Sequence, residues 1–503
     1  MKLLRHILCI CATAAVLGVP VDGRCENAMQ NAVDKFALGP TLRHASVGVC
    51  VMRLDSGLIV AGHAPEQSLI TASTMKTVTS ATALELLGKD FTFGTHVYAV
   101  GRIDNHGTLK GNLLVKGGGD PTLGSRYFPS QPAFADTVAA VLKQCGIGKI
   151  NGRIEVDGTA IPYPPVSPRW MVEDLGYDYG AGCFGLCFAD NVLTLSFDRS
   201  GEEPEDFSIS PQVEGIDINS HIVLGDKGDT LPVDYIEAIM DYDTPAINLW
   251  GGTHRSVLRY ADTFANPAPH LLLCDSIERR LDAADIAIRR KRIDAGTLTD
   301  TLLLLDYRSP QLTDILKSLL HRSDNMFTEM VLRAVASADG NMALPKFAIA
   351  KVDSLWKAHG VSTDALFMYD GSGLARNGRA SARFLCELLR AVYADRDTLG
   401  TDFSTLMPVA GLDGTLKSLL RGTALEGRIA LKSGSMGDVQ CFAGYYPATN
   451  PKYSVAVLVN NFNGTRRLLR RNIETLLLEL FTQHDECREN ADDIPASPDQ
   501  NGQ

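Results

Sequence analysis

A serine and a lysine lie one helical turn apart near the start of the chain, at Ser73 and Lys76. Residues three apart on a helix share a face, so the Ser73 hydroxyl and the Lys76 amine are predicted to be neighbours. A neutral lysine can take the proton from a serine that attacks a carbonyl group, which makes this pair a candidate nucleophile and base. The same spacing recurs at Ser354 and Lys357. The motif alone therefore does not identify the site.

Two downstream triplets supply what a serine–lysine enzyme needs besides this pair. Such an enzyme requires burial or a second cation to lower the pKa of the lysine, donors for the oxyanion, a proton relay and a group that binds the substrate carboxylate. Ser-Asp-Asn occurs at 323–325 and Lys-Ser-Gly at 432–434. Either triplet alone is typical of ordinary structure, a helix N-cap or a strand end. Together and in this order they match the Ser-x-x-Lys, Ser-Asp-Asn and Lys-Thr-Gly set of penicillin-binding proteins and class A β-lactamases, with Ser433 in the threonine position.

Both ends of the chain are predicted to build the elements that position these motifs. A helix is expected over 26–38, a hairpin of two strands over 46–63, and a helix from Ser73 to Leu87 that Gly88 ends. Near the C-terminus, three strands are expected over 427–434, 439–447 and 453–462, followed by a helix over 466–481. The second Ser-x-x-Lys lies in an amphipathic surface pattern after Ser-Asp-Asn, where Lys357 is expected to be a solvated charge. This context favours Ser73.

The middle of the chain differs in character, which predicts a domain organisation with an insertion. Residues from about 92 to 265 are rich in Gly, Asp and β-type runs. We predict a signal peptide at 1–23, one domain built from 24–91 and 266–484, β-rich inserted material at 92–265, and a disordered tail at 485–503. The basic start and short apolar core of 1–23 indicate an exported protein without a stable membrane span, in the periplasm or cell envelope.

Composition excludes several other classes of protein. The 503 residues carry a net charge of −11 and no long basic run, so nucleic acid is not an expected partner. The eleven cysteines lack the spacing of a zinc site, and no metal or cofactor is expected. Cys9 and Cys11 would leave with the signal peptide, and of the nine cysteines that remain Cys183 and Cys187 are closest in sequence, which makes them the candidate disulfide in an oxidising compartment. Gly180–Gly185 matches a dinucleotide fingerprint, but acidic and aromatic residues precede it instead of a buried strand.

The three motifs and several other stretches resemble those of one family, the class C low-molecular-mass penicillin-binding proteins. These are D-alanyl-D-alanine carboxypeptidases/endopeptidases that trim and open peptidoglycan cross-links. The stretches are GNLLVKGGGDPTL at 111–123, YDYGAG at 177–182 and DGSGLARN at 370–377. The long insertion between the first two motifs also fits, since position 323 lies 247 residues after position 76. The resemblance covers nearly the whole mature chain.

This resemblance implies a fold and a set of roles. The expected fold is α+β, a serine β-lactamase/transpeptidase-like domain with an antiparallel sheet packed by helices, a helical subdomain and β-rich inserted domains. Ser73 is expected to be the acylated nucleophile and Lys76 its base, with peptidoglycan peptides as substrates and β-lactam antibiotics as inhibitors. The resemblance implies that Ser323 relays the proton and that Asn325 contacts Lys76 and the substrate amide. Lys432 would lower the pKa of Lys76 through its charge and, with Ser433, bind the substrate carboxylate. Gly434 would allow close approach of the substrate backbone, and the N–H groups of Ser73 and Ser435 would form the oxyanion hole.

Two further residues concern the choice of substrate. By resemblance, Asp174 faces the amino group of a diaminopimelic side chain and Arg376 meets its carboxylate; otherwise each is a solvated surface charge.

Two other functions stay open at this point. A serine β-lactamase needs a deacylating base that the sequence does not reveal. A catalytically idle cell-wall-binding protein has no need of the complete motif set.

Overall fold

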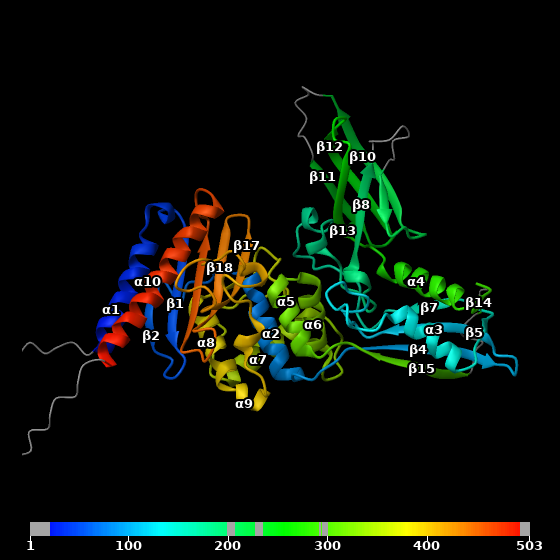
Figure 1. The fold of residues 1–503 in the computed structure, drawn as a ribbon, viewed down its shortest axis with the longest axis horizontal. Coiled ribbons are helices and arrows are strands. Elements are labelled where there is room, and N and C mark those ends of the chain that lie inside the picture. Colours follow the sequence, from blue (N-terminus) through cyan, green and yellow to red (C-terminus); the bar gives the residue numbers. More distant parts are fainter. Residues whose placement is uncertain (1–20, 199–206, 227–234, 291–292, 294–299, 493–503) are drawn as a thin grey trace, which may run out of the picture.

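The computed structural model describes residues 21–198, 207–226, 235–290, 293 and 300–492. Its central feature is a five-stranded antiparallel sheet in the order β17-β18-β19-β1-β2 (Figure 1). The predicted hairpin forms β1 (Ser46–Arg53) and β2 (Ile59–His63). The three predicted C-terminal strands form β17 (Ala430–Met436), β18 (Val439–Tyr446) and β19 (Tyr453–Asn460). Both ends of the chain therefore build one sheet, as the strand patterns predict.

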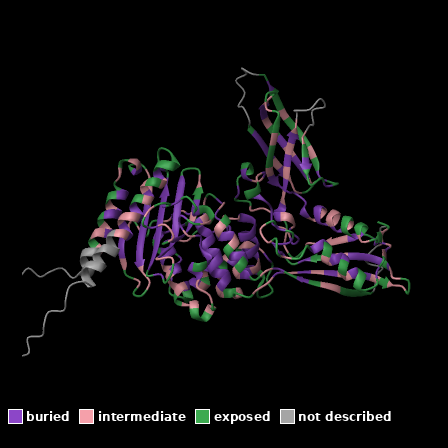
Figure 2. Ribbon diagram, viewed as in Figure 1, coloured by how far each residue is buried: buried purple, intermediate pink, exposed green. Residues whose placement is uncertain are grey.

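Helices cover both faces of this sheet. On one face lie α1 (Val21–Ala37) and α10 (Arg466–Asp492), the first and last helices, which contact each other. On the other face lies α8 (Ala382–Ala394), against β1 and β19. All residues of β18 and β19 are buried (Figure 2), because these strands carry apolar side chains on both faces. A sheet with both faces covered gives the edge strand β17 a rigid support.

A group of helices beside the sheet surrounds α2 (Met75–Leu87). Every residue of α2 from Met75 to Leu84 is buried, so this helix is an axis of the core and not a surface helix. It ends at Gly88, whose φ of 79° suits glycine. It contacts α5 (Leu312–Arg322), α6 (Asn325–Ser337) and α7 (Pro345–Ala358), whereas the short α9 (Arg396–Leu399) contacts α8. The structure thus has the expected α+β class with a helical subdomain.

Three further sheets lie between α2 and α5 in the sequence and project to one side of the helices (Figure 1). The largest contains β4 (Gly94–Ile103), β5 (Thr108–Gly117), β6 (Lys149–Ile150), β7 (Ile154–Asp157), β14 (Ala287–Ile288) and β15 (Thr301–Arg308), with α3 (Phe134–Gln144) and α4 (Pro269–Ala283) packed together. One small sheet contains β8 (Val192–Asp198), β9 (Ser208–Ser210) and β13 (Arg259–Ala265). The other contains β10 (Asp217–Gly225), β11 (Tyr235–Asp241) and β12 (Ala246–His254). A two-residue ladder joins β3 (Leu69–Ile70) to β16 (Arg379–Ala380).

The boundaries of the insertion differ from those expected at one end. Its start near residue 92 agrees with β4, but β15 pairs antiparallel with β4 and closes the same sheet at residue 308. A boundary at 265 therefore falls between β13 and α4, inside the inserted material. The helical period of α4 suggested a return to the first domain, whereas α4 packs on α3 of the insertion. Periodicity identifies a helix but not the sheet that it covers.

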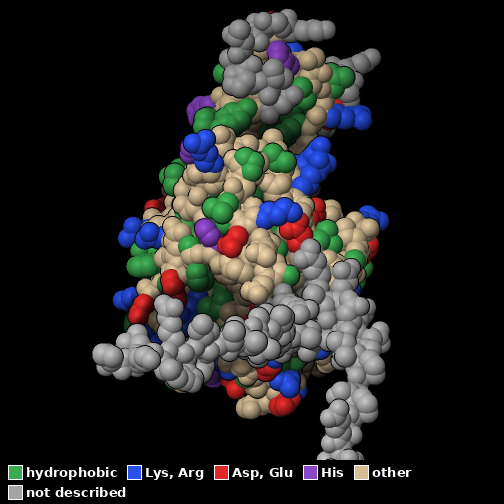
Figure 3. Space-filling view, turned by 90° about the vertical axis from the view of Figure 1, so that its left-hand side faces the viewer, with side chains coloured by type: hydrophobic (Ala, Val, Ile, Leu, Met, Phe, Trp, Pro, Cys, Tyr) green, Lys and Arg blue, Asp and Glu red, His purple; other side chains and the backbone are tan. Residues whose placement is uncertain are grey.

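The two ends of the chain lie partly outside the described residues. Residues 1–20, which hold most of the expected signal peptide, are among those not described. The expected tail begins at 485, but α10 continues to Asp492; residues 493–503 are not described. Among the described residues, no helix is both long and apolar enough to cross a membrane. The face shown in Figure 3 carries Lys and Arg side chains interspersed with Asp and Glu.

Candidate active site

The first motif lies where the chain enters the buried helix α2. Ser73 belongs to a single 3₁₀ turn, Ala72–Thr74, directly before α2, and Lys76 is the second residue of that helix. The Lys76 amine donates to Ser73 Oγ at 3.0 Å. It also donates to Asn325 Oδ1 at 2.5 Å and to the Ser372 carbonyl oxygen at 2.8 Å. Because Lys76 is fully buried, these three oxygens hold its amine against the serine.

The three residues of the second motif, Ser-Asp-Asn, have three different structural roles. Ser323 follows α5 in a left-handed conformation, with φ of 62°, which turns the chain sharply. Asp324 caps α6 by accepting from the Phe327 N–H at 2.8 Å. Asn325 begins α6 and donates to the Tyr179 carbonyl oxygen at 2.7 Å, so it links Lys76 to the insertion. The same triplet therefore contains an ordinary helix N-cap, Asp324, and two residues of the candidate active site, Ser323 and Asn325.

The third motif lies on the edge strand β17. Lys432 is fully buried, and its amine donates to Ser323 Oγ at 3.0 Å and to the Ser433 carbonyl oxygen at 2.6 Å. The hydroxyl of Ser433, in the position of the expected threonine, shares a hydrogen bond of 2.7 Å with Thr415 Oγ1. A threonine hydroxyl is thus present beside Ser433, although it comes from another segment.

Gly434 packs against the turn that carries the serine. A Cβ at this position would lie 2.5 Å from the Thr71 carbonyl oxygen, 2.8 Å from the Thr74 nitrogen and 3.0 Å from the Ser73 nitrogen. The missing side chain therefore lets β17 approach the turn that carries the serine. This contact lies within the protein itself, and the close approach of a substrate backbone to Gly434 stays a prediction.

Burial controls the charges of the two lysines. It lowers the pKa of Lys76 to about 8, against the opposing effect of three carboxyl groups, namely Asp370, Glu329 and Asp324. Burial, and then the charge of Lys76, lowers the pKa of Lys432 well below its ordinary value. Burial is the largest cause of the low Lys76 pKa, and the contribution expected from the charge of Lys432 stays a prediction. The two amines nevertheless disfavour each other's charge, so a neutral lysine is accessible near neutral pH.

A supporting layer of buried acids was missed by the sequence analysis. Glu329 accepts from the N–H groups of Gly371 and Ser372 at 2.8 and 2.7 Å and so holds the loop whose carbonyl contacts Lys76. Burial and the neighbouring Asp370 raise the pKa of Glu329 to about 7. Asp370 accepts from the indole N–H of Trp170 at 2.8 Å, which attaches the insertion to this loop. The stretch DGSGLARN contains Asp370 and this loop, but its sequence did not assign the acids a role.

Asp174 and Arg376 lie in the same cavity as the serine. A cavity of about 500 Å³ is lined by Ser73, Asn325 and Ser435 together with these two residues. Asp174 is buried and accepts a hydrogen bond of 3.3 Å from the Tyr179 hydroxyl, and burial raises the pKa of its carboxyl group. Arg376 is exposed and forms an ion pair of 2.6 Å with Glu173. The structure thus places both residues at the cavity, with Arg376 already paired.

The alternative motifs lie away from this site. Ser354 and Lys357 are on α7, where Lys357 pairs with Asp353 at 2.9 Å and Ser354 Oγ donates to the Lys351 carbonyl oxygen. Gly180 ends a 3₁₀ turn, and the described residues just before it form turns instead of the strand that a dinucleotide site requires. The candidate disulfide between Cys183 and Cys187 is not formed, and both thiols are free and buried. A short sequence separation did not bring the two sulfur atoms together.

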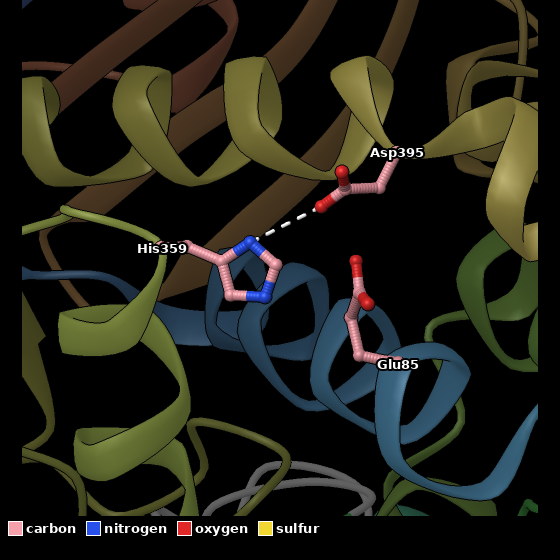
Figure 4. Close-up of side chains that lie close together, drawn as sticks. All are labelled: Glu85, His359 and Asp395. Atoms are coloured by element: carbon pink, nitrogen blue, oxygen red, sulfur yellow. Dashed lines mark ion pairs between the residues drawn. The ribbon is translucent and has the colours of Figure 1, made fainter.

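A second cluster of titratable side chains lies apart from the cavity, at the ends of three helices (Figure 4). His359 Nδ1 lies 3.1 Å from a carboxylate oxygen of Asp395, and Glu85 points toward the same space. Burial, and then the charge of Asp395, raises the pKa of Glu85. This ion pair joins the end of α7 to the end of α8 beside α2.

Fold and site together define a class of protein. An antiparallel sheet flanked by helices, with a buried Ser-x-x-Lys, a Ser-x-Asn and a Lys-Ser-Gly converging on one cavity, is the arrangement of the serine β-lactamase/transpeptidase-like enzymes. Here the insertion is large and supplies part of the cavity wall.

Comparison with known proteins identifies the family within this class. The pattern of the D-Ala-D-Ala carboxypeptidase 3 (S13) family matches residues 29–483, so the chain belongs to this family. It is 27% identical over 474 residues to the D-alanyl-D-alanine carboxypeptidase of Actinomadura sp. (strain R39), covering 90% of this chain and 84% of the relative. It is 25% identical over 426 residues to the D-alanyl-D-alanine carboxypeptidase DacB of Haemophilus influenzae, covering 84% and 86%.

Solved structures agree on the fold. The crystal structure of penicillin binding protein 4 (dacB) from Haemophilus influenzae aligns with a TM-score of 0.75 at 23% identity, over 90% of this chain and 99% of the other. The same protein complexed with a β-lactam aligns with a TM-score of 0.70. The expected β-lactamase/transpeptidase-like fold and the expected family are confirmed, and the protein is a serine-type D-Ala-D-Ala carboxypeptidase of that family.

Proposed function

We propose that this protein hydrolyses the bond after D-alanine in peptidoglycan stem peptides through an acyl-enzyme on Ser73. The observation that carries the proposal is the fully buried Lys76 amine, 3.0 Å from Ser73 Oγ, with its pKa lowered to about 8. A base with a pKa close to the working pH is effective at proton abstraction. The expected alternatives, a β-lactamase and an idle binding protein, have no comparable observation in their favour.

The proposed reaction follows from the hydrogen bonds at the site. Neutral Lys76 takes the Ser73 proton as Ser73 Oγ attacks the D-alanine carbonyl carbon, and the N–H groups of Ser73 and Ser435 stabilise the oxyanion. The proton passes to the leaving amine through Ser323, which Lys432 orients at 3.0 Å. The C–N bond breaks, and water then hydrolyses the serine ester. Lys432 and Ser433 bind the carboxylate next to the scissile bond.

Substrate binding is also expected to change the charges of Lys76 and Lys432. A substrate carboxylate beside Lys432 favours the charged form of that amine, because opposite charges attract. Charge on Lys432 in turn disfavours charge on Lys76, since the two amines already repel each other. Binding of the carboxylate thereby promotes the neutral base when it is needed.

Incubation of the protein with penicillin G, followed by mass spectrometry, tests this function. The expected result is a stable adduct of one penicillin on the peptide that contains Ser73. The absence of an adduct, or an adduct on another residue, contradicts the proposal. Rapid turnover of penicillin would instead favour the β-lactamase.

The protein is also proposed to act outside the cytoplasm, on the basis of the signal-like pattern of 1–23.

The low pKa of Lys76 predicts the dependence of acylation on pH. Only the neutral amine accepts the proton, so the second-order rate constant of acylation by penicillin should rise with pH and level off above about 8. Below that value the neutral fraction falls about tenfold for each pH unit. Stopped-flow acylation between pH 6 and 9 measures this profile. A flat profile over the range would show that Lys76 is not the titrating base.

Asp174 is proposed to read the amino group of a diaminopimelate-type side chain. Its carboxyl group lies in the cavity of Ser73, beside Tyr177 and Tyr179. We expect Asp174→Ala to reduce kcat/KM for such peptides more than tenfold, through loss of one charge-assisted contact of about 1.5–3 kcal/mol. Penicillin G lacks that side chain and should acylate Ser73 at nearly the native rate.

The isosteric variant Asp174→Asn separates recognition from folding. The amide oxygen of the new side chain can still accept from the Tyr179 hydroxyl, but the side chain carries no charge, so the same selective loss is expected. Equal losses on the peptide and on penicillin would show that Asp174 supports the fold and does not read the substrate.

A further inference from the structure

Ser73 lies between two cavities whose linings differ in charge. The larger cavity, described above, is lined by the acidic residues Glu173, Asp174 and Glu237 and by the basic residue Arg376. Among the described residues, none that lines a second cavity of about 230 Å³ is acidic. Both cavities contain Ser73, Ser323 and Ser435 in their walls, so the nucleophile is at their junction.

The second cavity is basic because of the first turns of α10. Arg466 and Arg470 line it, together with Thr415 and Ser433. Arg466 donates to the Gly437 carbonyl oxygen, and Arg470 donates to Ser418 Oγ at 3.1 Å. Within the described part of the chain, neither guanidinium forms an ion pair with an acid. Both are held near neutral acceptors, which leaves their charge available to a ligand.

The start of α10 adds to this positive potential. The helix begins at Arg466 and runs for 27 residues. The N-terminus of a long helix carries a partial positive charge from its unpaired N–H groups. Arg466 and Arg470 are four residues apart and so project from the same face of the helix. Two guanidinium groups and the helix terminus thus act on the same cavity.

The two cavities correspond to the two sides of the bond that is cleaved. In the proposed reaction, the acyl group stays on Ser73 and the amine leaves past Ser323 with the relayed proton. The larger cavity contains Asp174 and serves the acyl side. The second cavity contains Ser433, which binds the carboxylate of the leaving group, and therefore serves the amine side.

We propose that the second cavity is a subsite for an anionic peptide leaving group, bound by Arg466 and Arg470. This inference rests on the proposed function and specifies its substrate class. D-Alanine, the leaving group of a carboxypeptidase, has only six non-hydrogen atoms and a single carboxylate, which Ser433 already serves. In a cross-link the leaving amine belongs to a second stem peptide with further carboxylates. Cleavage of such cross-links already belongs to the carboxypeptidase/endopeptidase activity of the family. What the two arginines add is a preference for an anionic leaving peptide, and the reaction itself is unchanged.

Three substrates test the subsite on the native enzyme. One is a cross-linked peptide dimer. The second is the same dimer with the carboxylates of the leaving peptide amidated, except the one next to the scissile bond. The third is a single stem peptide ending in D-Ala-D-Ala. We expect kcat/KM for the first dimer to exceed that for the amidated dimer roughly tenfold or more, mainly through KM.

Substitutions on α10 test the two arginines. The double variant Arg466→Gln/Arg470→Gln should remove the preference for the charged dimer, while D-alanine release and penicillin acylation stay within about threefold of native. Arg467→Gln/Arg471→Gln is the matched control, because these exposed arginines share the helix but do not line the cavity. Arg466→Lys/Arg470→Lys keeps the charge and should restore part of the preference.

Several results would overturn the subsite. These are equal cleavage of the two dimers by the native enzyme, equal loss in the control variant, or an equal loss of D-alanine release in the double variant. If instead the proposed function itself is wrong, the native protein will neither form a penicillin adduct nor release D-alanine. A native enzyme that releases D-alanine but leaves both dimers uncut contradicts only the subsite.

Discussion

Replacing Ser73 by alanine is expected to abolish both penicillin labelling and D-alanine release. Ser73 Oγ is the hydroxyl that lies 3.0 Å from the buried Lys76 amine, and the covalent step has no other nucleophile at that place. Removing the nucleophile of a serine hydrolase typically costs about 10⁴-fold or more in rate. Labelling with penicillin and a D-alanine release assay measure the two losses.

The matched control for this change is Ser354→Ala, in the second Ser-x-x-Lys of the chain. Ser354 is exposed on α7 and its neighbour Lys357 pairs with Asp353, so no loss is expected. Thermal unfolding of both variants should stay close to that of the native protein, since each change removes only a hydroxyl oxygen. Loss of labelling in Ser354→Ala, with labelling retained in Ser73→Ala, would reverse the assignment.

Lys76→Arg is expected to inactivate the enzyme as thoroughly as Lys76→Ala. A guanidinium keeps its proton at every accessible pH, so it supplies charge but no base. The exchange is conservative in charge, and the comparison therefore separates proton transfer from electrostatic stabilisation. The measurement is the rate of acylation by penicillin G in both variants.

A larger side chain at a fully buried position also risks damage to the fold, so stability must be measured alongside. Lys357→Arg, on the exposed face of α7, is the control and should acylate at the native rate. Near-native acylation by a folded Lys76→Arg protein would mean that Lys76 acts only through its charge. The pH profile proposed above would then also be flat.

Much of the local structure was predictable from short stretches of sequence. The strands of the five-stranded sheet follow from apolar runs bounded by turn residues, and α2 ends at Gly88 as its pattern indicates. The three motifs were found because each needs a particular residue type in a particular local context. Local patterns are readable in this way because a helix or a turn is formed by residues close together in the chain.

The limits of the insertion were not predictable in the same way. The start of α4 has the period of a helix, and that period cannot show whether the helix covers one sheet or another. The strand β15 returns to pair with β4 across about 200 residues of intervening chain. Only the pairing register identifies the sheet to which such a strand belongs.

The family, the three motifs and the choice of Ser73 over Ser354 follow from the order of the residues without any coordinates. Three features appear only in the folded chain: the Ser372 carbonyl oxygen at Lys76, the contact of Gly434 with the serine turn, and the opposite charges of the two cavities. The contacts of Lys76 to Asn325 and Ser372 join residues 249 and 296 positions apart. A contact of that separation depends on how whole helices pack, because no local pattern encodes which distant atom will fill the space beside a buried amine.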